Sequence, residues 1–303
     1  MAITNPADTA ASAITLDPQQ SPRRRRSPRK LAGSALSSVL VALLLAIVFG
    51  PLVWMALGSF KTQSEFLNKP VWALPEQFNF DNYTTAITTG NFGQYALNSV
   101  LTVGPALFLV LLLGSMAGFA LEVLVWKGRG PVLFIFLGGI MVPIQMILLP
   151  LFAAYFNLGL TGSLWPLIIT YTATGLPLTV FLMATFFRAV PREIFEAATL
   201  DGASIIRSFF LVGIPMVRNA LFTVGLVQFF LLWNDLLIAL TFTNSGNLRT
   251  LQVGLLNFNG QFGSVQYGPL FAAICLNVFS ILIIYLVLNQ QIQKGLTAGA
   301  VKG

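Results

Sequence analysis

One charged stretch interrupts the apolar second half of the chain, and its residue types suit a contact with another protein. Residues 192–215 read REIFEAATLDGASIIRSFFLVGIP. Glu193 and Glu196 fall in the first turns of an expected helix, where the helix dipole favours negative charge. Gly202 can take the left-handed conformation that ends a helix, and Asp201 can cap a second one. We therefore expect two short helices joined at a glycine, forming a knob that another protein can grip.

Side chains that could perform catalysis are scarce. The sequence contains no His and a single cysteine, Cys275. His is the commonest general base and, with Cys, the usual ligand of zinc, so neither a catalytic base of this kind nor a Cys/His metal site is predicted. No Lys follows a Gly, so a G-K-[ST] phosphate-binding loop is missing. The sequence predicts no enzymatic activity, no metal and no cofactor bound by this chain.

Two carboxylates lie within apolar sequence. Glu122 precedes Lys127 by five residues, so we expect Glu122 to reach the membrane surface and pair there. Asp235 follows Asn219 by 16 residues; if a helix begins at Asn219, Asp235 lies about 24 Å along it, on the face of Gln228. Such a polar stripe could line a route for a solute or hold helices together, and the sequence leaves both readings open.

The elements that must position these groups are membrane helices. The chain has 303 residues, of which 56% are hydrophobic and 9% charged, and its mean hydropathy is +0.80. Soluble domains carry about 25% charged residues, so an all-α polytopic membrane protein is predicted. Six apolar runs are long enough to cross a bilayer; their approximate ranges are 31–57, 94–126, 131–156, 164–187, 219–242 and 267–289.

Three regions are expected: a disordered basic tail over 1–30, a six-helix domain over 31–290 that contains the charged loop 188–218, and a polar tail over 291–303. The first apolar run is too long for the core of a signal peptide. The Arg-rich N-terminal tail could bind RNA or acidic lipid, but an anchor that sets orientation is the simpler reading.

The distribution of charge predicts which side each segment faces. With the N-terminus inside, all of the 17 basic residues lie on the cytoplasmic side except Lys61, Lys69 and Arg249. This bias follows the positive-inside rule. Both termini and the loop 188–218 are therefore expected in the cytoplasm.

The charged loop resembles the cytoplasmic loop of ABC importer permeases, whose pattern is E-A-A, three residues, G, nine residues, I, one residue, L-P. The matching residues are Glu196, Ala197, Ala198, Gly202, Val212, Ile214 and Pro215. The stretches VPIQ at 142–145, YTATGLP at 171–177 and KGLTAGAVKG at 294–303 are similar to the carbohydrate branch of the family, in particular to the maltose-type small permease subunit. Asn219 stands where the family usually has a second proline, and for this reason we expect a regular helix capped at Asn219.

The resemblance implies a permease subunit of an ATP-driven sugar importer in the bacterial inner membrane. Its implied partners are a second permease in a heterodimer, two cytoplasmic ATPase subunits that bind ATP and Mg, and an extracytoplasmic sugar-binding protein. Residues implied to couple to the ATPase are Glu196, Ala197, Ala198, Asp201, Gly202 and Pro215. Tail residues implied to dock on the ATPase are Gly295, Thr297, Gly299 and Lys302.

A sugar route needs hydrogen-bonding groups and aromatic faces without strong charge. The candidates on the spans are Asn98, Gln145, Tyr155, Thr172, Thr174, Gln228, Asn234, Asp235 and Asn277. Each could instead be a packing residue. Other readings are an importer for glycerol phosphate, phosphate, amino acids or peptides, an ATP-independent channel, and a membrane enzyme, for which no clustered site is found.

Overall fold

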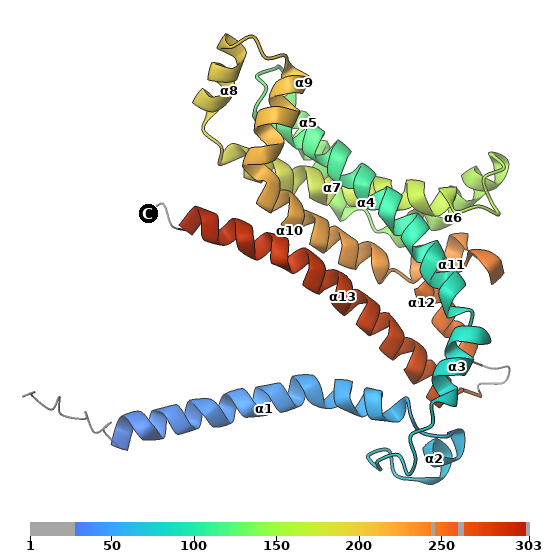
Figure 1. The fold of residues 1–303 in the computed structure, drawn as a ribbon. Helices are drawn as coiled ribbons and strands as arrows, with labels where there is room; N and C mark the ends of the chain where they lie inside the picture. Colours follow the sequence, from blue (N-terminus) through green and yellow to red (C-terminus); the bar gives the residue numbers. More distant parts are fainter. Residues whose placement is uncertain (1–27, 244–245, 260–263, 301–303) are drawn as a thin grey trace, which may run out of the picture. The chain divides into compact units, whose positions relative to one another are not determined.

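The structure is a computed structural model that describes residues 28–243, 246–259 and 264–300, with the backbone alone for 28–36 and 287–300. The described residues form helices and the segments that connect them (Figure 1). They also include one isolated β-bridge, between Asn259 and Val265. The chain divides after residue 52 into two units. The first contains most of α1 (Pro28–Gly58), and the second contains the end of α1 and all the other elements.

Five of the described helical segments are long and apolar enough to cross a membrane. They are Ser37–Gly58 of α1, α4 (Phe92–Glu122), α7 (Trp165–Arg188), the continuous segment Ile205–Trp233, and Tyr267–Leu286 of α13 (Tyr267–Ala300). These correspond to five of the six predicted spans. The all-α polytopic architecture is therefore confirmed.

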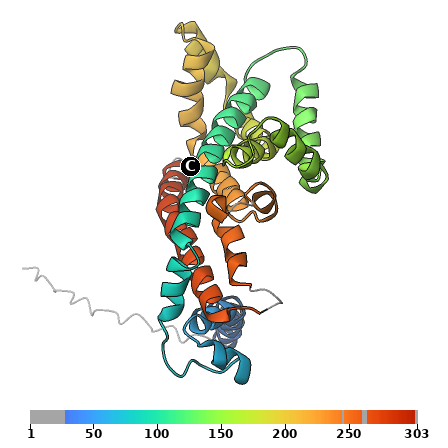
Figure 2. The ribbon, with the colours of Figure 1, turned by 90° about the vertical axis from the view of Figure 1, so that its right-hand side faces the viewer.

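The third predicted span, 131–156, is not one straight helix. It is divided into α5 (Arg129–Met141) and α6 (Ile144–Asn157), whose axes meet at 95° (Figure 2). Pro143 causes this break, because its ring excludes the helical conformation from Val142, which is extended with ψ at 115°. The pair counts as a sixth span only if the bent pair crosses as a unit.

The packing of α4 on α7 forms the centre of the second unit. Gly114 and Gly118 of α4 lie against α7 so closely that a Cβ on Gly114 would be 2.4 Å from Thr179 Cγ2, and one on Gly118 would be 2.8 Å from the backbone N of Ala184. Glycines four residues apart allow two membrane helices to approach in this way. The two helices thus pack closely enough to form the core of the second unit.

Short helices lie at both ends of this pair. α3 (Asp81–Thr88) lies at one end of α4, whereas α8 (Arg192–Leu200) and α9 (Ile205–Ser208) lie at the other (Figure 1). α2 (Gln63–Asn68) precedes α3 and begins with a capping box, in which Thr62 and Glu65 bond to each other's backbone N–H. The charged loop thus lies at the end of α4 away from the 59–91 segment.

The predicted start of the fifth span at Asn219 is wrong, because Asn219 lies inside α10 (Ile214–Trp233). α9 continues through a π-helical turn, η1 (Phe209–Gly213), directly into α10. The helix then ends at Trp233, and α11 (Leu237–Phe242) follows. Two 3-10 turns, η2 (Gly246–Leu248) and η3 (Leu255–Phe258), flank α12 (Leu251–Gly254) before α13.

Candidate functional site

The turn between α8 and α9 is built around Gly202. The φ of Gly202 is +80°, which confirms the predicted left-handed conformation at the end of the first helix. The N–H of Ala203 donates to the carbonyl of Ala198 (2.9 Å), and the N–H of Gly202 donates to that of Thr199 (3.0 Å). These two bonds define a Schellman motif. The distance in sequence from the E-A-A residues to Gly202 is therefore the one that a Schellman motif requires, and the carbonyl of Ala198 accepts the longer-range of its two hydrogen bonds.

The predicted role of Asp201 as the cap of the second helix is wrong. Asp201 is the C-terminal cap of α8, and its backbone N–H donates to the carbonyl of Ala197. Ser204 caps α9 instead, where its hydroxyl oxygen accepts a hydrogen bond from the N–H of Arg207 (3.3 Å). Asp201, Gly202 and Ala203 separate the end of α8 from Ser204, so the cap of α9 lies three residues later than predicted.

An aromatic cluster holds α8 against the membrane helices. The ring of Phe119, from α4, contacts the rings of Phe187, Phe195 and Phe209 edge-on, with centroids 5.5, 5.5 and 5.3 Å away. All four side chains are buried. Edge-to-face pairs of this kind add stability beyond their buried area. Because Phe195 belongs to α8, the cluster fixes this helix to α4, to the end of α7 and to η1.

The opposite side of the α8–α9 turn is exposed and mixes charge with apolar surface. Glu196, Ala197, Asp201 and Gly202 are exposed, and Ala198 is half-buried. Leu200 is 89% exposed, Ile205 60% and Ile206 68%. We name the surface formed by Glu196, Leu200, Gly202, Ile205 and Ile206 the knob surface.

Pro215 explains why the π turn lies between the knob and the span. A proline inside a helix lacks its N–H, and its ring clashes with the carbonyl four residues earlier. That carbonyl belongs to Leu211, within the wide turn 209–213. The N–H of Ile214 bonds to the carbonyl of Phe209, five residues back. The wide turn therefore accommodates Pro215 without breaking the helix.

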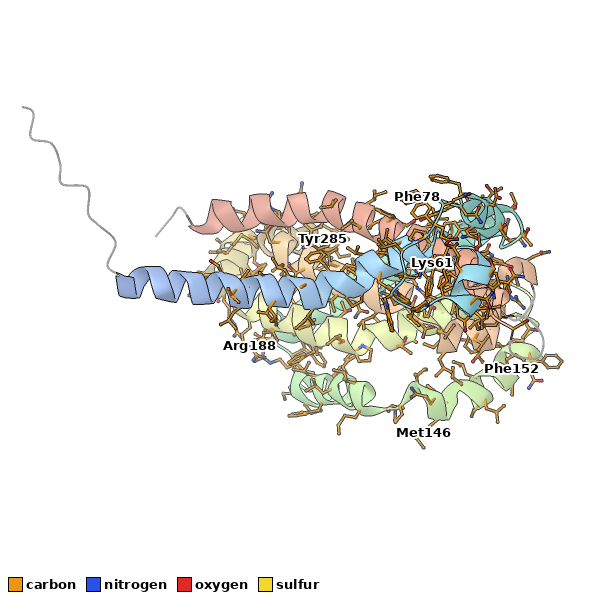
Figure 3. All side chains as sticks on the ribbon, turned by 90° about the horizontal axis from the view of Figure 1, so that it is seen from below. Lys61, Phe78, Met146, Phe152, Arg188 and Tyr285 are labelled. Carbon is orange, nitrogen blue, oxygen red and sulfur yellow. The ribbon has the colours of Figure 1, made fainter. Side chains whose placement is uncertain are left out.

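An ion pair lies beside the aromatic cluster. Glu122 accepts two hydrogen bonds from Arg188, from Nε at 3.0 Å and from Nη2 at 2.9 Å (Arg188 is labelled in Figure 3). The expectation that Glu122 would be paired is confirmed, and the structure adds the partner. The pair joins the last residue of α4 to the last residue of α7, directly before α8. A bidentate arginine pair of this kind is directional and fixes the two helix ends relative to each other.

Several candidates for the solute route bond to the segment after α10. Asn98 is buried and donates to the carbonyls of Asn247 (2.8 Å) and Arg249 (2.9 Å). Asn234 is exposed; its amide donates to the carbonyl of Phe230 and its oxygen accepts from Gln252 (3.3 Å). These contacts place Asn98 and Asn234 at the end of the helix pair that faces away from the knob.

Asp235 does not share a helix with Gln228, because α10 ends at Trp233. Its carboxylate accepts from the hydroxyl of Tyr171 (2.9 Å) and from the N–H of Ala239 (3.0 Å), so that it caps α11. Gln228 is buried farther along α10, where its amide donates to the carbonyl of Gly175 (3.0 Å) and to Thr179 Oγ1 (2.9 Å). The predicted stripe is therefore divided into a helix cap and a contact between helices.

The remaining candidates are dispersed over the helices. Tyr155 is buried with its hydroxyl 3.1 Å from that of Thr170, and Asn277 accepts from the indole N–H of Trp233 (3.1 Å). Thr172 and Thr174 donate to carbonyls of their own helix. Gln145 is exposed in the first turn of α6.

The predicted tail is only partly described. The backbone of α13 is helical to Ala300, and thus includes Gly295, Thr297 and Gly299, whose side chains lie outside the described residues. Lys302 and the basic tail over 1–27 lie outside them altogether. In the part of the chain that is described, no three His, Cys, Asp or Glu side chains gather where they could hold a metal ion.

Sequence reasoning missed a polar cluster that closes the end of the bundle near Asn98. The guanidinium of Arg249 donates to the side-chain oxygen of Asn257, whose amide donates to the hydroxyl of Tyr95 (2.9 Å). Among the described residues, Arg249 Nε and Thr250 Oγ1 are buried without a hydrogen-bond partner. The single charge in an otherwise neutral polar segment was the signal that could have identified Arg249.

The comparisons with known proteins extend along nearly the whole chain. Residues 110–297 match the family described as binding-protein-dependent transport system inner membrane component. The chain is 36% identical over 274 residues to the diacetylchitobiose uptake system permease protein NgcG of Streptomyces coelicolor, covering 90% of each chain. It is 30% identical over 268 residues to the trehalose/maltose transport system permease protein MalG of Thermococcus litoralis, covering 88% of this chain and 96% of that one.

The fold is also found in a solved structure. A chain of a bacterial ABC transporter involved in the import of the acidic polysaccharide alginate superposes with a TM-score of 0.75, at 20% identity, over 88% of this chain and 98% of that chain. The family match covers more than half of the sequence, and the helices long and apolar enough to span a membrane agree with an inner membrane component. This chain therefore belongs to the family of binding-protein-dependent transport system inner membrane components.

Proposed function

We propose that this chain is a permease subunit of an ATP-driven importer for a sugar, a mono- or oligosaccharide. The named substrates of its relatives, diacetylchitobiose and trehalose or maltose, support the substrate class.

The observation that carries the ATP-driven mechanism is the knob surface. It combines an exposed carboxylate, Glu196, with the exposed apolar side chains of Leu200, Ile205 and Ile206. Apolar side chains at this density mark a contact with another protein. We assign this contact to a separate ATPase subunit, on which ATP and Mg bind, because this chain has no phosphate-binding loop of its own.

The knob can transmit movement because it is joined rigidly to the spans. α9 continues through η1 into α10, and Phe195 packs α8 on Phe119 of α4. A displacement applied at the knob surface therefore reaches α4 and α10 together. The other partners in the proposal are a second permease, a second ATPase subunit and an extracytoplasmic binding protein, with the knob and both termini in the cytoplasm. The tail over 294–303 is proposed to dock on the ATPase, through Gly295, Thr297, Gly299 and Lys302.

Uptake by the reconstituted transporter tests this proposal. The complete complex is purified through this chain, placed in liposomes and supplied with ATP and its binding protein, and labelled disaccharides, an amino acid and glycerol phosphate are compared. ATP-dependent uptake of a sugar supports the proposal. ATP-independent flux would identify a channel, and preference for one of the other solutes would exclude the sugar assignment.

Two charge reversals on α8 separate the coupling contact from a general effect of charge. Glu196→Lys places the wrong charge on the knob surface and should abolish uptake while leaving membrane insertion unchanged. Glu193→Lys makes the same change in the first turn of α8, outside the E-A-A pattern, and should keep most of the uptake. Equal uptake by the two variants and the wild type would remove the support for coupling at Glu196.

A further inference from the structure

Lys61 is a buried cation outside the membrane spans. It lies three residues past the end of α1 and is 3% exposed (labelled in Figure 3). Its backbone is fixed, because its N–H donates to the carbonyl of Gly58 (3.0 Å) and its carbonyl accepts from the amide of Asn82 (2.9 Å). Lysine is almost never fully buried unless it is paired, so the surroundings of its ammonium group are informative.

The described residues offer this ammonium group little compensation. Its hydrogen-bond acceptor is the carbonyl of Val71, at 3.5 Å, and that carbonyl is already bonded by the indole N–H of Trp54 at 2.7 Å. The ring of Phe66 lies 5.6 Å from Nζ and adds a cation–π contact. An ammonium group has three N–H donors, so at least two point to no acceptor among the described residues.

The neighbouring carboxylates are engaged elsewhere. Glu65 accepts from the N–H and hydroxyl of Thr62 (2.7 and 2.9 Å) and from the N–H of Glu76 (2.8 Å). The carboxylate of Glu76 forms an ion pair with Lys69. Lys61 is thus the cation of this region without a carboxylate partner among the described residues. A buried charge in this condition is costly unless an anion from outside the chain reaches it.

Lys61 lines a cavity of about 290 Å³. Aromatic side chains form one wall of this cavity: Trp54, Phe66, Tyr267 and Phe271. They contact one another, with ring centroids 5.3–5.4 Å apart. Leu67 and Val71 form part of the rim, and they are 67% and 66% exposed. Glu65, Lys69 and Pro70 complete the lining. Because Glu65 accepts from backbone N–H groups and Lys69 is paired with Glu76, Lys61 is the charge in this cavity without a charged or backbone N–H partner among the described residues.

The cavity lies at a membrane boundary. Trp54 belongs to the last turns of one spanning helix, and Tyr267 is the first residue of another. Tyr and Trp are concentrated at the level of lipid headgroups, and an ammonium group forms strong charge-assisted hydrogen bonds with a phosphate. We propose that the Lys61 cavity binds the phosphate of a phospholipid, with the glycerol and upper acyl chains against the aromatic wall and the exposed rim.

Binding of a defined lipid to the complete, delipidated transporter tests the proposal. Native mass spectrometry measures the affinity for dioleoyl phosphatidylglycerol and for dioleoylglycerol, which has the same chains but no phosphate. Lys61→Met keeps the length of the side chain but removes the charge, and should weaken phosphatidylglycerol binding about tenfold, as expected for a charged hydrogen bond. Lys61→Arg should bind within about threefold of the wild type.

A matched control removes an ion pair beside the cavity, of which Lys69 belongs to the cavity lining and Glu76 does not. The double variant Lys69→Met/Glu76→Gln should bind phosphatidylglycerol as the wild type does, because its two charges already compensate each other. If Lys61→Met does not assemble, hydrogen exchange over residues 58–71 of the wild type decides instead. Phosphatidylglycerol should slow this exchange and dioleoylglycerol should not.

Three results would overturn the proposal. Equal affinity of the wild type and Lys61→Met for phosphatidylglycerol would show that Lys61 does not hold the phosphate. Equal protection of residues 58–71 by the two lipids would show that the cavity recognises only the apolar chains. Displacement of the lipid by millimolar inorganic phosphate, with the protection retained, would assign the cavity to free phosphate rather than to a lipid.

Discussion

The backbone conformation of the knob favours a residue without a side chain at position 202, where Gly202 lies. A Cβ at this position would meet no atom within 4 Å, so steric contact with neighbours plays no part, and the φ of +80° alone disfavours a side chain. Gly202→Val should cost about 1–2 kcal/mol in the knob and strongly reduce uptake. Gly202→Asn is the control, because Asn tolerates the left-handed conformation, and it should keep most of the activity. Equal loss by both variants would point to a steric role for the glycine.

Glu65 makes one extramembrane segment sensitive to acid. The backbone N–H of Glu76 and then that of Thr62 hold the pKa of Glu65 below its usual value. A carboxylate with a lowered pKa stabilises the fold at neutral pH, and this stability is lost as the pH falls through the lowered pKa. At pH 7, Glu65→Gln should therefore speed amide hydrogen exchange near Thr62 and Glu76 about tenfold.

The difference between Glu65→Gln and the wild type should disappear below the lowered pKa of Glu65, where both side chains are neutral. Hydrogen exchange is measured across this pH range and corrected for the intrinsic rate. A difference that persists unchanged at the acidic end would mean that the substitution acts through packing rather than through charge.

At the level of elements, the packing of α4 on α7 leads to opposite predictions for Gly118 and Gly104, which both belong to α4. A Cβ on Gly118 would press on the backbone of α7, so Gly118→Ala should destabilise the protein by about 1–3 kcal/mol. Gly104 has no atom within 4 Å of such a Cβ, so Gly104→Ala should be neutral or stabilise by up to about 1 kcal/mol. The midpoint of thermal unfolding in detergent compares them. A similar midpoint for both would show that α4 and α7 separate easily.

The apolar runs predicted most elements because length and hydropathy are properties of the sequence itself. Their ends depended on single residues. Pro143 breaks the third run, whereas Pro215 leaves the fifth helix continuous because a π turn accommodates it. Whether a proline bends or breaks a helix is decided by what packs around it, which the sequence does not state. The Gly114–Gly118 spacing, in contrast, was visible in the sequence and was overlooked.

The candidate site was predicted unevenly for a similar reason. Gly202 and the exposed Glu196 follow from local backbone geometry, and both were predicted. The ion pair of Glu122 with Arg188 and the hydrogen bond of Asp235 with Tyr171 join residues 66 and 64 positions apart, respectively. Such contacts depend on the packing of α4, α7 and α11, so spacing along one expected helix could not give them.

At the level of the whole molecule, the segments at the two ends of α4 should face opposite sides of the membrane, and cysteine labelling can show which side each one faces. α4 has 31 residues, or about 46 Å at 1.5 Å per residue, which exceeds the ~30 Å hydrocarbon core. Pro70 and Lys127 are exposed and lie beyond opposite ends of this helix. In a Cys275→Ser background, Pro70→Cys should react with an impermeant reagent added outside, and Lys127→Cys only after the cells are opened. The reverse pattern would place the knob surface outside the cell.

The wide turn at 209–213 has a consequence for the direction in which the knob points. A π turn takes up about one residue more than an α turn, and each residue of an α-helix advances the winding by about 100°. Because the wide turn accommodates Pro215, the proline favours the extra residue, and this residue sets the direction of the knob relative to α10. Pro215→Ala restores the N–H and should let the turn tighten, swinging the knob by up to about 100° around the axis of α10. The distance between spin labels at Lys127→Cys and Leu200→Cys, in the Cys275→Ser background, reports this rotation; an unchanged distance would mean that the turn stays wide without its proline.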